Sequence, residues 1–162
     1  MKQMWEVKLL EQDRQTLYGI AGMSSDTAQR RDIPAFSAKL YQSLDCKKGT
    51  YLPFYVVSHG YDEKNGAFML FVGGKIQHPK LEQLVLPAGT YASITVHPKL
   101  GFLWGPAIGA AKRWFYTVWL PSQPYESVNL EYELHTESSS GTHAAIDLLF
   151  AIRETSERRE RT

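Results

Sequence analysis

The sequence has little cysteine, no excess of charge of either sign and no long hydrophobic run, and each lack excludes a class of protein. The 162 residues include one cysteine, so an internal disulfide framework or a four-cysteine zinc site is impossible. The net charge is +1, without the basic excess that nucleic-acid binding by phosphate neutralisation requires. The longest apolar stretch, residues 84–111, is interrupted by Lys99 and prolines, and no apolar signal core precedes Glu6. We therefore expect a soluble cytoplasmic protein with no membrane segment and no direct contact with nucleic acid.

The common catalytic motifs are also missing. Residues 73–75 lack the glycine spacing and the following Ser or Thr of a phosphate-binding loop, and neither Gly-x-Ser-x-Gly nor His-Glu-x-x-His occurs. The five histidines are scattered, and Cys46 follows the predicted first helix, where the helix dipole opposes a thiolate. The residues thus predict no metal and no cofactor, and they leave the question of enzymatic activity open.

Aromatic side chains are abundant by contrast. They make up 12% of the residues, more than a core of this size needs. Several crowd into residues 114–125. At helical spacing Phe115 and Trp119 share the core face, whereas Trp114 and Tyr116 lie to either side of it, so one of these two is expected to face a cleft or solvent.

Hydrophobic periodicity predicts strands joined by two helices. The expected strands are 4–10, 17–23, 54–59, 67–73, 91–96, 130–135 and 144–152. The first helix is expected near Ile33, with Pro34 at its start and Asp26 as a candidate N-cap, and to end at Lys47–Gly49. The second is expected to run from Pro106 to Leu120.

The order strand, helix, hairpin occurs twice. Asn65-Gly66 marks the turn of the first hairpin. We predict an α+β fold of two β-α-β-β repeats in a pseudo-twofold arrangement, with one antiparallel sheet, two main helices on one face and a groove between the halves. The expected domain is 1–153, with halves of about 1–80 and 81–153, and 154–162 is a charged tail.

Glu131 is the candidate polar group of this groove. Alternation over residues 128–134 places Glu131 and Glu133 opposite Leu130 and Tyr132. On a wet face two glutamates are unremarkable. In a groove lined by aromatics, one of them would be a desolvated carboxylate that binds a cation or acts as a general acid.

Four segments also match a known family in order along the chain. They are a strand ending in Val-Gly (68–73), a Pro-Ala-Gly-x-Tyr turn (87–91), an aromatic stretch ending in Trp-Leu-Pro (115–122) and a strand with a glutamate about ten residues later (130–131). Together they resemble the GyrI-like small-molecule-binding domains, also called effector-binding domains of bacterial transcription activators. The similarity covers about residues 4–153, and it implies the same pair of β-α-β-β repeats.

The resemblance implies a ligand site, in which Glu131 takes the position of the family's pocket glutamate. The expected ligand-binding residues are Phe68, Tyr91, Trp114, Tyr116, Trp119 and Glu131. The sequence departs from the family pattern at Leu130 and Glu133, which replace aromatic residues. It also departs one turn before Tyr116, where Lys112 could pair with a glutamate.

The resemblance also implies a range of functions. Many members are drug-sensing regulators related to the AraC type, with an upstream DNA-binding unit for which we expect no room here. We favour a standalone binding protein for aromatic, lipophilic and often cationic molecules, of the multidrug-sensor kind. The alternatives are a metal-independent hydrolase of cyclopropane-type electrophilic xenobiotics, with Glu131 acting on water, and a gyrase-inhibitor-like module that binds a protein partner. A homodimer remains open.

Overall fold

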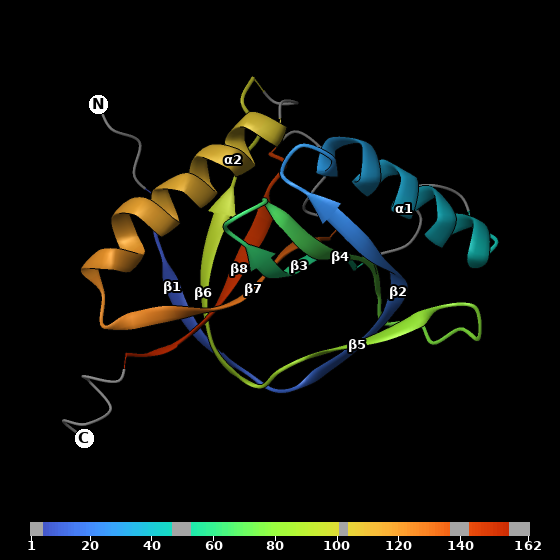
Figure 1. Ribbon diagram of the computed structural model, residues 1–162, viewed down its shortest axis with the longest axis horizontal. Coiled ribbons are helices and arrows are strands. Elements are labelled where there is room, and N and C mark those ends of the chain that lie inside the picture. Colours follow the sequence, from blue (N-terminus) through green and yellow to red (C-terminus); the bar gives the residue numbers. More distant parts are fainter. Residues whose placement is uncertain (1–4, 47–52, 101–103, 137–142, 156–162) are drawn as a thin grey trace.

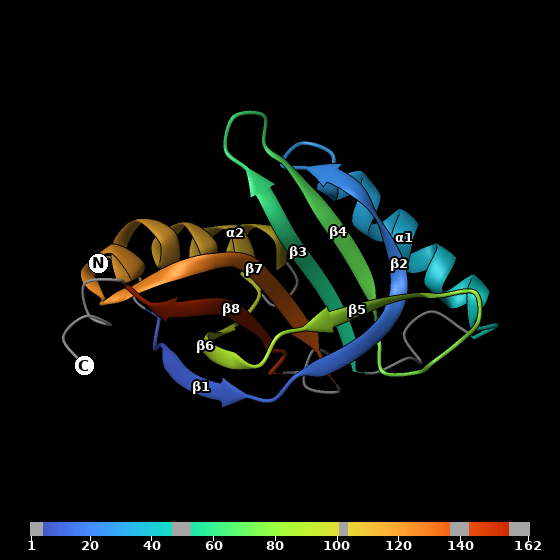
Figure 2. The ribbon, with the colours of Figure 1, turned by 60° about the horizontal axis from the view of Figure 1, so that its bottom comes forward.

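A computed structural model of the protein describes residues 5–46, 53–100, 104–136 and 143–155. The described residues form one antiparallel sheet of eight strands in the order β1-β6-β8-β7-β3-β4-β2-β5. The strands are β1 (Lys8–Gln12), β2 (Gln15–Ser25), β3 (Phe54–Asp62), β4 (Ala67–Gly74), β5 (Glu82–Leu86), β6 (Gly89–Val96), β7 (Tyr125–His135) and β8 (Ile146–Glu154). The helices are α1 (Gln29–Ser43) and α2 (Trp104–Trp114). Both lie on the same side of the sheet (Figure 1), and the sheet curls beneath them (Figure 2).

The strand order confirms the predicted pseudo-twofold arrangement. From the centre outwards, β7-β8-β6 on one side mirrors β3-β4-β2 on the other. An edge strand adds to each predicted β-α-β-β repeat: β1, which overlaps the strand expected at 4–10, and β5, for which no strand is predicted. Each of these strands crosses over: β1 pairs with β6 of the second half, and β5 pairs with β2 of the first. β5 begins 74 residues after Lys8, at Glu82, and β6 begins 74 residues after Gln15, at Gly89.

Three hydrophobic clusters hold the sheet and the helices together. Under α1, Leu40 packs with residues of β3 and β4. Under α2, Ala111 and Phe115 pack with residues of β6 and β8. The third cluster lies on the opposite face of the sheet and consists of strand residues, among them Tyr91 and Tyr132, so the curled sheet buries its own inner face.

A glycine pair allows a close approach of two strands in the first half. Gly19 on β2 pairs with Gly73 on β4. A Cβ added to Gly19 would lie 2.1 Å from the carbonyl oxygen of Val72, so a side chain does not fit. In the second half, the equivalent strands are β6 and β8. The pair equivalent to Gly19 and Gly73 is Ser93 and Leu149, so both positions carry side chains there.

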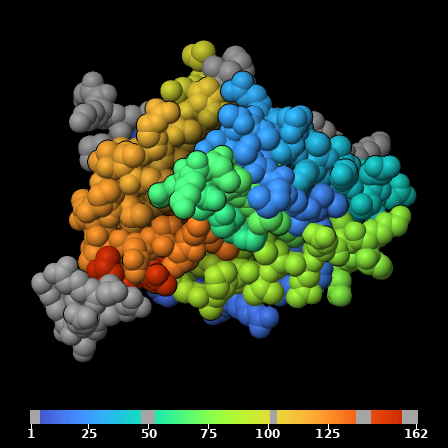
Figure 3. All heavy atoms as spheres, in the orientation of Figure 1, coloured from blue at the N-terminus to red at the C-terminus, as the bar shows by residue number. Residues whose placement is uncertain are grey.

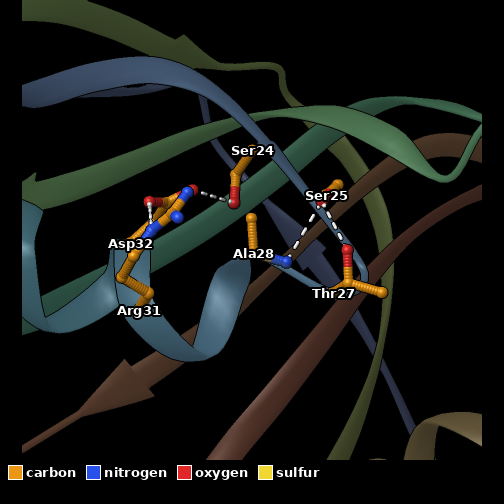
Figure 4. Close-up of polar contacts among 6 residues, drawn as sticks. All are labelled: Ser24, Ser25, Thr27, Ala28, Arg31 and Asp32. Atoms are coloured by element: carbon orange, nitrogen blue, oxygen red, sulfur yellow. Dashed lines mark hydrogen bonds and ion pairs between the residues drawn. The ribbon is translucent and has the colours of Figure 1, made fainter.

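The first helix begins one turn earlier than predicted because serines fix its start (Figure 4). Ser25 Oγ accepts a hydrogen bond from the Ala28 N–H at 3.1 Å, and the buried Ser24 donates to Asp32 Oδ2 at 2.8 Å. Asp26, the predicted N-cap, binds Tyr61 instead. The polar run before Ile33 has no hydrophobic periodicity from which its helical state could be predicted. The predicted helix end at 47–49 lies outside the described residues.

The second helix changes its winding where the sequence predicts a continuous helix. α2 is followed by a π-helical turn at Phe115–Trp119 and then a 3₁₀ turn at Leu120–Ser122. Pro121 stands in the 3₁₀ turn rather than immediately ending an α-helix. In the described ranges, neither helix has the length and apolar character needed to cross a membrane.

Candidate functional site

A cavity of about 710 Å³ lies on the helix side of the sheet, where the two halves of the chain meet. Its lining residues come from the start of α1, the β3–β4 hairpin, the end of α2 and β7: Asp26, Gln29, Ser58, Tyr61, Glu63, Phe68, Lys112, Tyr116, Leu120, Ser127, Asn129, Leu130 and Glu131. Ser58 and Glu131 face each other across the β3–β7 pair at the centre of the sheet. In Figure 3 the green β3–β4 hairpin lies between the orange α2 segment and the blue β2–α1 segment.

Glu131 is held from both sides by residues of the second helix. Lys112 Nζ lies 2.8 Å from Glu131 Oε2, and the Tyr116 hydroxyl donates a hydrogen bond to Oε1 at 3.0 Å. The side chains of Lys112 and Glu131 are 26% and 20% exposed. Both carboxylate oxygens are therefore engaged within a partly buried group.

The π-helical turn explains how one helix presents these residues in line. Lys112, Tyr116 and Leu120 all line the cavity at a spacing of four residues. In a regular α-helix with 3.6 residues per turn, side chains at this spacing drift round the axis. A π turn contains more residues per turn and offsets that drift. The irregularity thus keeps three side chains on the cavity side, while Phe115 stays in the core.

Charge and burial set the protonation states of the inner residues. Burial acts to lower the pKa of Lys112, but the carboxylates of Glu131 and Glu133 raise this pKa by more, and the net shift is upward. Burial, assisted by the charge of Glu131, also raises the pKa of Tyr116. At neutral pH, Lys112 is therefore a cation and Tyr116 keeps its proton, so both donate to Glu131.

Asp26, Tyr61 and Glu63 form the rim of the cavity, and all three are exposed. The Tyr61 hydroxyl donates to Asp26 Oδ2 at 2.6 Å, and this hydrogen bond raises the pKa of Tyr61. Asn129, at a bulge in β7 with a φ of 59°, binds both the N–H and the carbonyl of Tyr61 through its side-chain amide. The β3–β4 hairpin is thus bound to the turn between β2 and α1 on one side and to β7 on the other.

The structure brings together three of the six residues expected to bind a ligand. Phe68, Tyr116 and Glu131 line the cavity. Tyr91, Trp114 and Trp119 do not. Tyr91 lies in the cluster inside the curled sheet and donates to the Pro87 carbonyl, and its burial raises its pKa to about 12. The ring of Trp114 lies 5.6 Å from Trp5, and the ring of Trp119 stacks on Phe115 at 5.3 Å.

Sequence reasoning missed the rim. Asp26 and Tyr61 are 35 residues apart, and no local pattern predicts their contact. Asn129 could have been predicted to mark a bulge in the strand, because asparagine tolerates a positive φ better than most residues. At Lys112, where the sequence departs from the family pattern, the structure contains the expected pairing with a glutamate.

The cavity carries more negative than positive charge. Its lining includes three carboxylates (Asp26, Glu63 and Glu131) and one ammonium group, that of Lys112. Across the described part of the chain, no group of three His, Cys, Asp or Glu side chains could hold a metal ion. The chemistry available in the cavity is therefore aromatic and apolar contact, hydrogen bonding and electrostatic attraction.

Solved structures with a similar fold include the following three. SAV2435, solved with bound tetraphenylphosphonium, aligns with a TM-score of 0.68 and 12% identity over 97% of this chain and 99% of that chain. A putative bacterial transcription regulation protein from Staphylococcus aureus MU50 aligns with a TM-score of 0.64 and 11% identity over 94% and 99% of the two chains. The C-terminal domain of EcmrR aligns with a TM-score of 0.62 and 13% identity over 94% and 100%.

These structures confirm the fold expected from the resemblance. The chain shares with them an α+β fold of one antiparallel sheet and two helices, which is the fold that the resemblance implies. No protein-family model matches the sequence, and no curated protein matches it significantly. The assignment of the fold thus rests on structural similarity. The class of ligand has to be inferred from the residues that line the cavity.

Proposed function

We propose that this protein binds a lipophilic, ring-bearing small molecule in the cavity between its two halves, as a sensor or binding protein of the effector-binding-domain type. The observation that carries the proposal is the cavity itself. About 710 Å³ is within the range of small-molecule sites, and it lies at the junction of two structural repeats, where such sites are common.

The lining supports a ligand with aromatic or aliphatic rings. Tyr61, Phe68 and Tyr116 offer aromatic surfaces, and Leu120 and Leu130 offer aliphatic ones. Stacking and cation–π contacts contribute about 0.5–2 kcal/mol each. The excess of carboxylates favours a positive over a negative charge on the ligand. The tetraphenylphosphonium bound to SAV2435 is a ligand of this class in a protein of the same fold.

The hydrolase alternative has less support from the site. A general base needs a carboxylate oxygen within hydrogen-bond reach of water. Each oxygen of Glu131 already has one partner, Lys112 or Tyr116, so a water molecule would compete with these two donors for the carboxylate. We therefore propose binding rather than turnover.

The proposal is tested by thermal shift and calorimetry with three probes of similar shape. They are tetraphenylphosphonium (cationic), triphenylphosphine oxide (neutral) and tetraphenylborate (anionic). A ligand at about 100 times its Kd adds about 2.7 kcal/mol to the free energy of unfolding, a rise in Tm of about 5–10 °C for this size of domain. We expect the neutral and cationic probes to bind, and the anionic probe to bind more weakly than either.

A pair of variants locates the binding. Tyr61 is 40% exposed, so Tyr61→Ala should leave the fold intact and weaken the probes about 3- to 30-fold by removing one ring contact. Tyr18→Ala is the matched control, since Tyr18 lies on β2 outside this cavity. Absence of binding by all three probes, or equal effects of the two variants, would overturn the proposal.

A further inference from the structure

Lys112 brings a positive charge into the cavity from the protein's own chain. It lies on α2 one turn before Tyr116, and its Nζ is 2.8 Å from Glu131 Oε2. Of the described residues lining the cavity, it is the only Lys or Arg. A ligand's cation at Glu131 would therefore lie close to this ammonium and be repelled by it.

Each oxygen of Glu131 already has a partner from this chain, and the charge of the carboxylate is matched by that of Lys112. Tyr116 donates to Oε1, and Lys112 pairs with Oε2. Displacing Lys112 would leave a partly buried ammonium without its partner, and the loss of one member of such a pair is costly. At neutral pH the inner end of the cavity therefore behaves as a neutral, hydrogen-bonded surface.

The rim has the opposite character. Asp26 and Glu63 are exposed carboxylates, and of the two Asp26 accepts a hydrogen bond from the uncharged Tyr61 hydroxyl. The cavity thus carries negative charge at its rim, whereas at its inner end the charges of Glu131 and Lys112 cancel. A ligand fits this pattern when its ring system is uncharged and its positive charge extends from one end.

We propose that Lys112 is the specificity-determining residue of this cavity: it takes the place of a ligand's cation at Glu131 and restricts the ligand to lipophilic amines, whose ring system enters the cavity while the ammonium group stays at the rim beside Asp26 and Glu63. This inference rests on the proposed function and adds the class of ligand to it. A centrally charged ion such as tetraphenylphosphonium should bind the wild type more weakly than the neutral triphenylphosphine oxide does, because its charge would enter the cavity together with its rings.

The first test is Lys112→Met, which keeps the aliphatic stem and removes the charge. We expect this variant to bind tetraphenylphosphonium about 10- to 100-fold more tightly than the wild type, as removal of a nearby like charge from a partly buried site predicts. The affinity for triphenylphosphine oxide should change less than about 3-fold, since that probe carries no net charge. Arg113→Met is the matched control: it removes one positive charge from the same helix at a residue outside the cavity lining.

A double variant tests whether the change in affinity comes from the charge of Glu131 and not from a change in the fold. Lys112→Met with Glu131→Gln removes both charges, and the affinity for tetraphenylphosphonium should return to within about 3-fold of the wild type. A second measurement tests the rim. 4-Phenylbutylamine should lose about 5- to 10-fold in affinity in Asp26→Asn, whereas triphenylphosphine oxide should not.

The outcomes separate this inference from the proposed function. If the neutral probe binds in a Tyr61-dependent manner but Lys112→Met does not strengthen phosphonium binding, or Arg113→Met strengthens it equally, the role of Lys112 is wrong and the binding function stands. If no probe binds to either the wild type or Lys112→Met, the proposed function itself is wrong.

Discussion

The two halves of the chain share one order of elements, β-β-α-β-β, but they supply different parts of the cavity. The first half gives the exposed rim, with Asp26 and Tyr61. The second half gives the partly buried inner end, with Lys112, Tyr116 and Glu131. The repeated architecture thus accounts for where the cavity lies, and the differences between the repeats account for its chemistry.

The helices show the difference most clearly. α1 is an α-helix throughout its 15 residues, although it contains Pro34, and it contributes Gln29, at its start, to the cavity lining. α2 is shorter and passes into a π turn, and residues from this irregular end line the cavity. Irregular helical turns of this kind are frequent at functional sites.

The substitution with the largest expected loss of stability lies in the core of the second half. Phe115 is fully buried and stacks on Phe150 with ring centroids 3.8 Å apart. Phe115→Ala should lower the free energy of unfolding by about 3–5 kcal/mol. Phe36 of α1 is half-buried, and Phe36→Ala should cost about 1–2 kcal/mol because less apolar surface is lost. Urea denaturation of both variants measures the contrast, and equal losses would contradict it.

The glycine pair gives a prediction confined to the first half. Gly19→Ala places a Cβ 2.1 Å from the Val72 carbonyl oxygen, so the strands must shift. We expect a loss of about 1–3 kcal/mol. Gly109→Ala is the control in α2, where nothing lies within 4 Å of the added Cβ. That variant should gain about 0.5–1 kcal/mol from helix propensity, and a loss from both variants would show that the close approach is not the cause.

The polar start of α1 gives the smallest expected effect. Asp32→Ala removes the acceptor of the buried Ser24 hydroxyl, which is 7% exposed, and should cost about 1–2 kcal/mol. Arg31 also contacts Asp32, at 3.3 Å, but its side chain is 80% exposed. Arg31→Ala should therefore cost less than about 0.5 kcal/mol. Thermal unfolding at low ionic strength compares the two, and a larger loss in Arg31→Ala would refute this account.

The central strands were predictable because their signals are local. Alternation and the Asn65-Gly66 turn define the β3–β4 hairpin, and Gly66 has the positive φ that the turn requires. The edge strands β1 and β5 are five residues each, and most of their side chains are exposed or half-buried. β1 overlaps the strand predicted at 4–10 but begins at Lys8, whereas no strand is predicted at β5. Their pairing with the opposite half depends on contacts distant in sequence.

The sequence predicted residues at the inner end of the cavity but none of the residues at its rim. Alternation placed Glu131 and Glu133 on one face of β7 without deciding whether the helices cover that face. Helical spacing placed Tyr116 beside the core face of the second helix. In the structure Glu131 and Tyr116 both line the cavity. Helical spacing also put Trp119 with Phe115 on the core side, and the two rings do stack. The hydrogen bond of Tyr61 with Asp26 joins a hairpin to a helix start, and such a contact follows only from the tertiary fold.

The crossing of β1 and β5 has a consequence for how the chain folds. Lys8 pairs with Ser93 of β6, so the edge of the sheet at β1 cannot form before more than half of the chain is available. Pairings that span so much sequence slow folding, because the loop entropy is lost before the contacts are gained. Neither half can complete its own sheet, and we expect the two halves to fold in one cooperative transition, with β1 and β5 docking late.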